Sequence, residues 1–506
     1  MSLDVPLDLP VVLLSHRGPV SAHQDDTGGT TLSRGAGGLV TALIGLAVQV
    51  PDLVWVCVAP PGEDAELARS ADDGVLRLEL GPPARLLDPD EVGDTPLRLR
   101  LVEIPREVHE PFYGVIANPL LWFVQHRLYG LAVEPSLGRE EHRAWEQGYV
   151  EANRLAAQAV IEQVQAFGGR ATVLVHDYHF YLVPQLVRQQ CPQVLISHFV
   201  HIPWPGPDSW RVLPPTMREA VLHGLLGCDV VGFHTTSDAR SFLLCVQELL
   251  GLPVDLQQGS VQVGSRLVRA RAYPISIDIA ALVEVAQSEQ TQTHLDQLSP
   301  TGLMVLRVDR TDPSKNIVRG FQAFELMLEE HPELVGEVVF LALLQPSRQD
   351  VPEYAAYLTE IGAAAARVNA RFGTGSWQPV DLRMASELPL AVAAYRRCDV
   401  LMVNAVTDGM NLVAKEAVVV NEHDMVLALS ESTGAHGELG RFAVTLHPFD
   451  LSQQADALYA ALTMPQPERA ARRQAAAEVV RRNDVRRWLQ VQLSDLAGLD
   501  GENPDG

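Results

Sequence analysis

The sequence is poor in cysteine, has no paired cysteine motif and contains no apolar run long enough to cross a membrane. Its five cysteines are scattered over 506 residues without a CxxC spacing, which is typical of a reducing compartment, and we expect them to be small buried residues. The N-terminus lacks a basic region followed by an apolar one, and the most apolar stretch, residues 37–50, falls well short of about 20 uninterrupted apolar residues. These absences argue against a secreted or membrane protein and predict a soluble, cytoplasmic one.

Basic residues are also few. The chain has 39 Lys and Arg against 63 Asp and Glu, which gives a formal charge of −24. Nucleic acids and anionic membranes are bound by basic surfaces, so neither is an expected partner. Any anionic ligand must then be bound by a local group of cations. The chain also exceeds the length at which one hydrophobic core keeps growing, so two domains are expected.

Short, continuous apolar runs alternate with amphipathic segments along the chain. Such runs indicate parallel strands covered on both faces, and the alternation predicts two doubly wound, Rossmann-like α/β domains. The stretch RLVRARAYPISID is interpreted as a crossing between them. We expect an N-terminal domain (1–278), a C-terminal domain (279–482) and a last segment (483–506) whose helix packs back on the N-terminal domain. The runs are LPVVLLS, LVWVCVA, ATVLVHD, VLISHFVHI, DVVGFH, GLMVLRV, EVVFLAL, DVLMVNAV and MVLALS.

Loops at the carboxyl ends of parallel strands build the ligand site of such a fold, so polar residues after each run are the candidates. Arg17 follows the first run, and then comes a glycine turn, in which Gly37 and Gly38 let the backbone approach an anionic ligand at a helix start. A dinucleotide fingerprint is disfavoured because its third glycine position holds Val40 and the turn lies about 20 residues beyond the strand. A glycine cluster that serves only helix packing is the structural alternative.

Histidines close two further runs. His176, Asp177, Tyr178 and His179 end one of them, and His201 ends the other, before Ile-Pro-Trp-Pro. No metal-binding spacing accompanies them, so a metal site is disfavoured, and a helix-cap or core role is expected for His176 or His179. The prolines fix the corner that carries His201, which suits a hydrogen bond to a ligand.

Two cations lie close together after the run GLMVLRV. Arg310 and Lys315 flank a turn broken by the pair Asp312-Pro313, and Arg348 follows a later run. In a strongly acidic chain such a group of cations favours an anionic ligand, although a solvated surface pair is the alternative. Neither Arg17 nor Arg348 has an evident partner other than an anion.

The segment TDGMNLVAKE lies between an apolar strand and a helix. Asp408 and Asn411 offer an acceptor and a mixed donor-acceptor for hydroxyl groups, the backbone from Gly409 to Leu412 offers N–H donors, and Glu416 lies about one helical turn further on. Glu416 is therefore placed to bind the ribose of a nucleotide whose phosphates lie at the helix start. Together with the cations, this pattern predicts a sugar-nucleotide transferase with its site between the two domains.

The sequence resembles the retaining glucosyltransferases of the trehalose-6-phosphate synthase type, which have the GT-B fold of two Rossmann-like domains facing a central cleft. The resemblance spans nearly the whole chain in family order. It implies an enzyme without metal or cofactor that forms trehalose 6-phosphate from UDP- or GDP-glucose and glucose 6-phosphate, with retention of configuration. The matching segments include SHRGPV, GAGGLVTAL, FYGVIANPLLW, VHDYHFYLVPQLVR, HFVHIPWP, AYPISID, VDRTDPSKNI, PSRQDVPEY, DGMNLVAKE and NDVRRWLQVQLSDL.

The resemblance also implies residue roles. The catalytic group would be Arg310, Lys315, His201 and Asp408. Donor binding would add Gly37, Gly38, Gly409, Met410, Asn411, Leu412, Val413 and Glu416. The acceptor pocket would consist of Arg17, Tyr113, Trp122, Asp177, Tyr178 and Arg348, with its phosphate on Arg17, Tyr113 and Arg348.

Four positions depart from the family pattern: His16, Val58, Pro313 and Thr407 stand where asparagine, tryptophan, tyrosine and arginine are usual. The missing tryptophan normally lines the acceptor pocket, so another phosphorylated acceptor is an alternative. A cyclitol acceptor, as in the related pseudo-glycosyltransferases, and a non-catalytic sugar-phosphate sensor are others, but the intact DGMN turn and leaving-group cations favour the enzyme. The donor base and the formation of a homo-oligomer are left open by the sequence.

Overall fold

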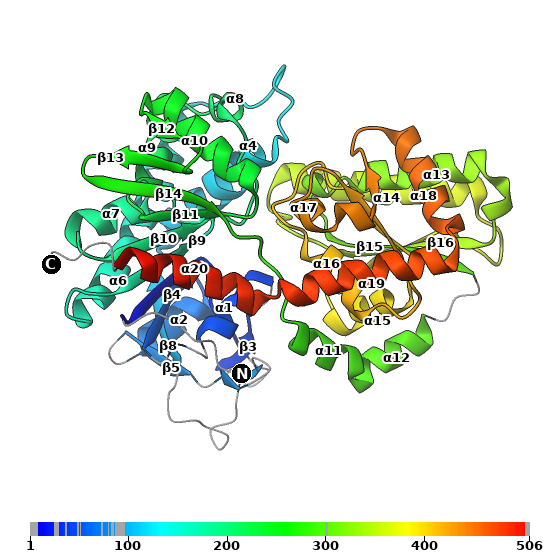
Figure 1. The fold of residues 1–506 in the computed structure, drawn as a ribbon, viewed down its shortest axis with the longest axis horizontal. Coiled ribbons are helices and arrows are strands. Elements are labelled where there is room, and N and C mark those ends of the chain that lie inside the picture. The colour runs from blue at the N-terminus through cyan, green and yellow to red at the C-terminus, as the bar shows by residue number, and fades with distance from the viewer. Residues whose placement is uncertain are drawn as a thin grey trace. The chain divides into compact units, whose positions relative to one another are not determined.

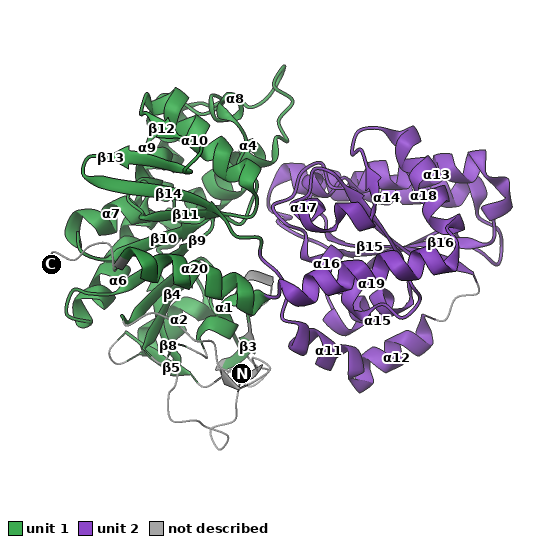
Figure 2. Ribbon diagram, in the orientation of Figure 1, with its two compact units in different colours: residues 1–274, 485–506 green, residues 275–484 purple. Residues whose placement is uncertain are grey.

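The computed structural model describes residues 9–24, 30–35, 38–47, 50, 52–71, 74–78, 80–81, 85–86, 97–298 and 302–500. It divides into two compact units (Figure 2): unit 1 comprises residues 1–274 and 485–506, and unit 2 comprises residues 275–484. The boundaries expected at residues 278 and 482 lie within a few residues of these. None of the described helices has the length and apolar character needed to cross a membrane.

Unit 2 contains one sheet of six parallel strands. They are β15 (Leu303–Arg310), β16 (Val338–Gln345), β17 (Val380–Met384), β18 (Val400–Val403), β19 (Val426–Ser430) and β20 (Val444–Leu446). Their order across the sheet is β17-β16-β15-β18-β19-β20. The chain therefore builds outward from β15 in one direction and then from β18 in the other, and the crevice at this switch point is where ligands bind in such sheets.

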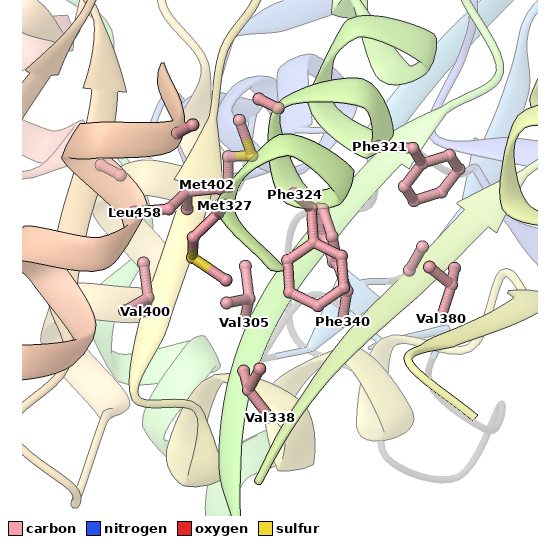
Figure 3. Packing of buried hydrophobic residues seen from close by; sticks show 14 of the residues in the cluster. Val305, Phe321, Phe324, Met327, Val338, Phe340, Val380, Val400, Met402 and Leu458 are labelled. Carbon is pink, nitrogen blue, oxygen red and sulfur yellow. The ribbon is translucent and has the colours of Figure 1, made fainter. Parts of the chain in front are cut away.

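Helices cover both faces of the unit 2 sheet (Figure 1). One layer holds α13 (Ile317–Glu330), α14 (Pro352–Phe372) and α18 (Leu451–Thr463), and the other holds α15 (Leu388–Arg397), α16 (Leu412–Val420) and α19 (Gln466–Arg482). Figure 3 shows Phe321, Phe324 and Met327 of α13 packed on Phe340 and Val305 of the sheet. Burial on both faces explains why these strands are continuously apolar. The remaining elements are α11 (Ile279–Gln287), α12 (Glu289–Gln297), α17 (His436–Leu439) and the 3₁₀ turns Pro313–Lys315, Pro332–Leu334 and Gly440–Phe442.

Unit 1 contains a larger, mixed sheet in the order β12-β13-β14-β11-β10-β9-β1-β4-β8-β5. The strands are β1 (Val11–Ser15), β4 (Leu53–Ala59), β5 (Leu76–Leu78), β8 (Leu97–Glu103), β9 (Thr172–His176), β10 (Leu195–Phe199), β11 (Val230–Phe233), β12 (Val254–Asp255), β13 (Ser260–Val263) and β14 (Arg266–Ala272). The switch point lies between β1 and β9. The same outward order as in unit 2 thus recurs around a second crevice.

The expected parallel pairing holds for the central strands of unit 1, and both edges of its sheet add antiparallel strands. Strand β5 pairs antiparallel with β8, and β12, β13 and β14 form an antiparallel meander. The segment RLVRARA, interpreted above as part of the crossing, is strand β14, and the crossing follows it. Its alternation of polar and apolar residues marks a strand with one uncovered face, which an apolar-run criterion does not detect.

A separate hairpin, β2 (Val20–Gln24) with β3 (Thr30–Arg34), follows β1 and leads into α1 (Gly38–Ala47). The C-terminal helix α20 (Val485–Asp500) packs on α1 and β10 within unit 1 (Figure 1). The other helices of this unit are α2 (Glu63–Ser70), α3 (Arg106–Pro111), α4 (Trp122–His126), α5 (Arg139–Ala144), α6 (Glu151–Ala166), α7 (Val183–Gln190), α8 (Pro207–Trp210), α9 (Pro215–Leu225) and α10 (Thr236–Leu250). Two π-helices, Phe112–Leu121 and Trp145–Val150, the 3₁₀ turn Tyr178–Phe180 and the short strands β6 (Leu80–Gly81) and β7 (Arg85–Leu86) complete it.

Candidate active site

The switch point of unit 2 brings a cation, an acid and an amide together. Arg310 ends β15, Lys315 lies in the loop after it, and Asp408 follows β18. The Lys315 amine forms an ion pair with the Asp408 carboxylate, which also accepts a hydrogen bond from Asn411 Nδ2 at 3.1 Å. Burial lowers the pKa of Lys315, but the carboxylates of Asp408 and Asp309 outweigh it and hold the pKa above its ordinary value. A charged lysine is therefore fixed at this edge.

A fully buried arginine shapes the loop that carries Lys315. Arg307 donates from Nη2 to the carbonyl of Lys315 at 2.9 Å and from Nη1 to that of Ile317 at 3.3 Å, and its Nε donates to Asp309 Oδ2 at 2.9 Å. Sequence reasoning missed Arg307 and Asp309. Their signal was the presence of two charges inside the apolar run LMVLRVDR, because a buried charge must be paired.

Pro313, where the family pattern has a tyrosine, fits this loop. It opens a 3₁₀ turn over residues 313–315 whose start is capped by Asp312, since Oδ1 of Asp312 accepts from the backbone N–H of Ser314 at 2.9 Å. Asn316 then takes a left-handed conformation with φ 60°. The proline ring presets the φ that the turn requires, so the loop is stiffened next to Lys315.

The turn after β18 is held by a neighbouring loop. The Asp408 N–H donates to the Ser432 carbonyl at 3.2 Å, and the Gly434 N–H donates to the Asp408 carbonyl at 3.1 Å. A Cβ at Gly434 would lie 1.9 Å from the Gly409 oxygen, so only glycine allows this approach. Asn411, at φ 70°, caps α16 by accepting from the Ala414 N–H at 3.3 Å. The first N–H groups of α16, on Leu412 and Val413, have no partner within the helix.

One helical turn further on, Glu416 is held by a tyrosine. The Tyr395 hydroxyl donates to Glu416 Oε2 at 3.0 Å, and burial raises the pKa of Glu416. The adjacent Lys415 is buried and donates to Glu438 Oε2 at 2.5 Å and to the Ile275 carbonyl at 2.8 Å. Lys415 thus secures α16 while Glu416 keeps a carboxylate near the helix start.

Arg348 has protein partners, which corrects the expectation that only an anion would bind it. Its Nη1 donates to the Tyr354 hydroxyl at 2.6 Å and lies 3.8 Å from Asp312 Oδ2. The Tyr354 hydroxyl in turn donates to Asp312 Oδ2 at 2.9 Å. The sequence could not show this because Asp312 looked like a turn residue, whereas the fold buries it completely.

In unit 1 the switch point is lined by stacked rings. The His16 imidazole stacks on His179 at 4.2 Å between centroids and on Tyr113 at 5.1 Å. His109 also stacks on Tyr113 at 5.5 Å and lies 6.4 Å from His16, and burial lowers the pKa of His109. Arg17, next to His16, is exposed. The departure at position 16 therefore adds a ring to a cluster formed with His109, Tyr113 and His179.

The glycine turn and Val58 lie beside the loop after β1. The Gly35 N–H donates to the Pro19 carbonyl at 2.7 Å, and Gly38 is the first residue of α1. Gly37 lies outside the described residues. Val58, where the family has a tryptophan, is a buried residue of β4 whose N–H donates to the His16 carbonyl at 3.2 Å.

Asp177 and Tyr178 follow β9 in a constrained turn. Asp177 has φ 73°, its N–H donates to the Phe199 carbonyl at 2.8 Å, and its carbonyl accepts from His198 Nε2 at 3.1 Å. Such a φ is costly for a non-glycine residue and is common at functional sites. Tyr178 is buried: its hydroxyl donates to Asn118 Oδ1 at 2.8 Å, and its ring meets Trp122 edge-on at 5.6 Å.

His201 is linked to a second histidine. Its Nε2 lies 3.0 Å from Nδ1 of His176, and its backbone carbonyl accepts from His234 Nε2 at 3.2 Å. Burial lowers the pKa of His176 and of His198 to about 3 and lowers that of His201 well below its ordinary value. The core role expected for His176 or His179 is confirmed for both, since each is buried, whereas the roles of His198 and His234 were missed. His234 ends the apolar run DVVGFH, so the criterion of a polar residue at the end of a run could have identified it.

The carboxyl edge of the sheet in each unit can perform a different part of a group-transfer reaction. In unit 2, cations and helix-start N–H groups can stabilise a diphosphate, while a carboxylate and amides can bind hydroxyls. In unit 1, a ring stack beside Arg17 and Asp177 can bind a sugar and an attached anion. Among the described residues, no group of three or more His, Cys, Asp or Glu side chains is arranged to hold a metal ion.

Comparison with known proteins assigns the family. The sequence model of Glycosyltransferase family 20 matches residues 10–498. The chain is 30% identical over 504 residues to alpha,alpha-trehalose-phosphate synthase (UDP-forming) of Pichia angusta, covering 96% of this chain and 98% of that one. It is 32% identical over 483 residues to alpha,alpha-trehalose-phosphate synthase (UDP-forming) A of Dictyostelium discoideum, covering 94% and 61%.

Solved structures agree. A trehalose-6-phosphate enzyme from E. coli bound with UDP-2-fluoro glucose matches with a TM-score of 0.80 at 26% identity, covering 96% of this chain and 99% of that one. An alpha,alpha-trehalose-phosphate synthase (UDP-forming) from Burkholderia xenovorans in complex with glucose-6-phosphate matches with a TM-score of 0.77 at 26% identity, covering 96% and 99%. The resemblance stated from the sequence is thereby confirmed, together with the GT-B fold class. The chain is a glycosyltransferase and belongs to glycosyltransferase family 20.

Proposed function

We propose that the protein transfers glucose from UDP-glucose to glucose 6-phosphate and releases trehalose 6-phosphate and UDP. One observation carries the proposal: a charged lysine is held by Asp408 and Asn411 at the switch point of unit 2, in the loop that begins with Arg310. The donor nucleotide follows from relatives named as UDP-forming and from the E. coli structure with UDP-2-fluoro glucose. The acceptor follows from the B. xenovorans complex with glucose-6-phosphate.

In the proposed reaction, the anomeric hydroxyl of glucose 6-phosphate attacks the anomeric carbon of the donor glucose. The bond from that carbon to the diphosphate oxygen breaks, and its electron pair stays on UDP. The acceptor hydroxyl loses its proton to the departing phosphate oxygen on the same face of the sugar, so configuration is retained. Negative charge grows on the diphosphate during this step, and Arg310 and Lys315 stabilise it more strongly as it grows, which accelerates the reaction.

The other residues bind the two substrates. Asp408, Asn411 and His201 hold hydroxyls of the donor glucose, and Glu416 accepts a hydrogen bond from the ribose. The N–H groups of Leu412 and Val413 face the diphosphate at the start of α16. For the acceptor, Arg17 and Tyr113 bind the phosphate, and Asp177 binds a sugar hydroxyl. Tyr178 and Trp122, both buried, support the wall of this pocket.

The test is a product assay. The purified chain is incubated with UDP-glucose or GDP-glucose and with glucose 6-phosphate, glucose or a cyclitol, and products are identified by mass and by the anomeric coupling constants in proton NMR. We expect a disaccharide phosphate with two α-anomeric protons from UDP-glucose and glucose 6-phosphate only. Equal turnover with unphosphorylated glucose, or no turnover with any pair, would contradict the proposal.

A further inference from the structure

The residue behind His201 is placed to control which of its ring nitrogens carries a proton. His176, the last residue of β9, lies next to the end of β10, and its Nδ1 is 3.0 Å from Nε2 of His201. His201 is partly exposed, whereas His176 is buried. Only the inner ring of the pair is therefore shielded from solvent and from ligands.

Both rings are neutral near pH 7, since burial lowers the pKa of each far below that value. Two neutral imidazoles can form this hydrogen bond only if one donates and the other accepts. If His176 donates from Nδ1, His201 carries its proton on Nδ1 and offers a ligand a donor. If His201 donates from Nε2, its Nδ1 offers a ligand an acceptor instead. The inner histidine thus decides what the outer one presents.

The surroundings of His176 favour the first arrangement. The ring also lines a cavity of about 10 Å³ whose other lining residues are mostly apolar, including Leu46, Leu174 and Leu489. The second arrangement would place the proton of His176 on Nε2, which makes no hydrogen bond to any described residue, whereas the first leaves only a lone pair there. Buried N–H groups without a partner are rarer than under-satisfied acceptors. Within the described residues, the polar lining groups Ser197 and Gln492 make no hydrogen bond to this ring.

The backbone around the pair is itself fixed by histidines. His234 donates to the carbonyl of His201 at 3.2 Å, and His198 donates to the carbonyl of Asp177, the residue after His176, at 3.1 Å. The ring of Phe199 packs on His201 at 4.4 Å, and Trp488 of α20 lies 6.1 Å from it. These hydrogen bonds and ring contacts restrict the positions of the two imidazoles. The geometry of their hydrogen bond is therefore set before a ligand binds.

We infer that His176 is a positioning residue that donates its Nδ1 proton to Nε2 of His201, so that Nδ1–H of His201 is the donor presented to a hydroxyl of the donor sugar. The inference rests on the proposed function for the identity of that ligand. The tautomer of His201 in the free protein does not depend on it. In chemical terms, an acceptor oxygen of the sugar would be recognised, and a ligand group that can only donate would be disfavoured.

The test combines a tautomer measurement with matched substitutions. In 15N-histidine-labelled wild type, the ring nitrogen shifts should show His201 protonated on Nδ1 and His176 on Nδ1. His176→Asn places an amide donor near the position of Nδ1 and should keep donor kcat/KM within about threefold. His176→Asp offers only an acceptor there, so it should move the His201 proton to Nε2. That variant should lower donor kcat/KM roughly tenfold, the effect of one lost hydrogen bond, with acceptor KM unchanged.

His223→Asn removes an exposed histidine of the same unit and serves as the control for labelling and folding. Nε2-protonated His201 in the wild type would overturn the inference, whatever the activity of the variants. An unchanged donor kcat/KM in His176→Asp would also overturn it. If the wild type makes no trehalose 6-phosphate but His201 has the expected tautomer, the proposed function fails and the assignment of the His176–His201 hydrogen bond stands.

Discussion

The carboxyl edges of the two sheets share a strand order but differ in chemistry. In unit 1 the switch point is lined by aromatic rings, with His16 in stacking contact with both His179 and Tyr113. In unit 2 it is lined by charges, with Lys315 paired to Asp408 beside Arg310. The strand order creates a crevice in both units, and the residues that follow the strands decide what each crevice can bind. A sugar suits rings and hydrogen-bonding groups, whereas a leaving diphosphate requires cations.

Lysine usage separates the two units further. The chain has only two lysines, Lys315 and Lys415, and both belong to unit 2. Each is ion-paired with a carboxylate, Asp408 and Glu438 respectively. All other basic side chains except histidine are arginines, whose planar fork suits bidentate contacts, whereas an ammonium is a compact charge. Lys315 is therefore the one lysine of the chain that lies among the proposed donor contacts.

The largest expected effect follows from removing the leaving-group cations of unit 2. Lys315→Ala and Arg310→Ala should each lower kcat by roughly 10²–10³, because each removes a fixed charge that stabilises the departing diphosphate. Donor KM should change less, since the other contacts remain. Steady-state kinetics with EDTA present throughout measure both constants, and Arg383→Ala, which removes a surface arginine paired with Asp381, is the control. A wild-type rate abolished by EDTA, or full kcat in Lys315→Ala, would contradict the assignment.

The same assignment can be checked without a variant. Amine-specific labelling in native buffer, read by peptide mass, should modify Lys315 slowly, and UDP should slow it further. Lys415 is 1% exposed at its side chain and should stay unmodified with or without UDP. Labelling of Lys315 at the same rate in saturating UDP would place the diphosphate elsewhere.

A second pair of substitutions compares the two arginines assigned to the acceptor phosphate. Arg17→Ala should raise the KM for glucose 6-phosphate by about 10–100-fold, since a charge-assisted contact contributes about 1.5–3 kcal/mol, and should leave the melting temperature unchanged because Arg17 is exposed. Arg348→Ala should instead destabilise the protein by about 3 kcal/mol or more, because it leaves the buried Asp312 carboxylate without its cation. Kinetics and thermal unfolding of both variants give the comparison. Equal melting temperatures would show that the Arg348–Asp312 contact contributes little.

The neutral histidines of unit 1 should make the protein sensitive to acid. His176 and His198 have pKa values of about 3 in the folded protein against about 6.5 when unfolded. Between these values the unfolded chain binds more protons, so stability is complete above about pH 6.5 and falls as the pH drops toward 3. At pH 5 each of these two histidines should therefore lower the free energy of unfolding by about 2 kcal/mol.

His198→Gln keeps a donor near Nε2 and removes the titrating group. Between pH 7 and pH 5 this variant should lose about 2 kcal/mol less stability than the wild type. Urea unfolding followed by tryptophan fluorescence is the measurement, because six of the seven tryptophans belong to unit 1. An equal loss of unfolding free energy in the wild type and in His198→Gln would show that His198 is not held neutral.

The smallest expected effect concerns the ribose contact of unit 2. Glu416→Gln should raise donor KM by about fivefold and leave kcat nearly unchanged, because a ribose hydrogen bond of about 1 kcal/mol is alike in the ground and transition states. Tyr395→Phe, which removes the hydroxyl that holds Glu416 at 3.0 Å, should act in the same direction and more weakly. A loss of kcat without a change in KM would assign Glu416 to the chemical step instead.

The sequence by itself determined the architecture and supplied the candidate residues for both sites. Each of the nine apolar runs contains a strand of one of the two sheets, because burial on both faces leaves a continuous apolar signature. Sequence reasoning also selected Arg310, Asp408 and His201 as candidates, since each is a polar residue that follows an apolar run. Strands with one uncovered face were not found, as β8 and β14 show, because they alternate.

Only the tertiary structure decided which distant residues contact one another at the sites. Arg348 meets Asp312, His176 meets His201, and Gly434 fits under the carbonyl of Gly409 because the fold brings the ends of separate strands to one edge. Hydropathy reports how deeply a residue is buried and carries no information on which distant side chain lies beside it. A hydrogen bond or ion pair depends on a few tenths of an ångström between such segments. The charges and tautomers of the site are therefore set by packing.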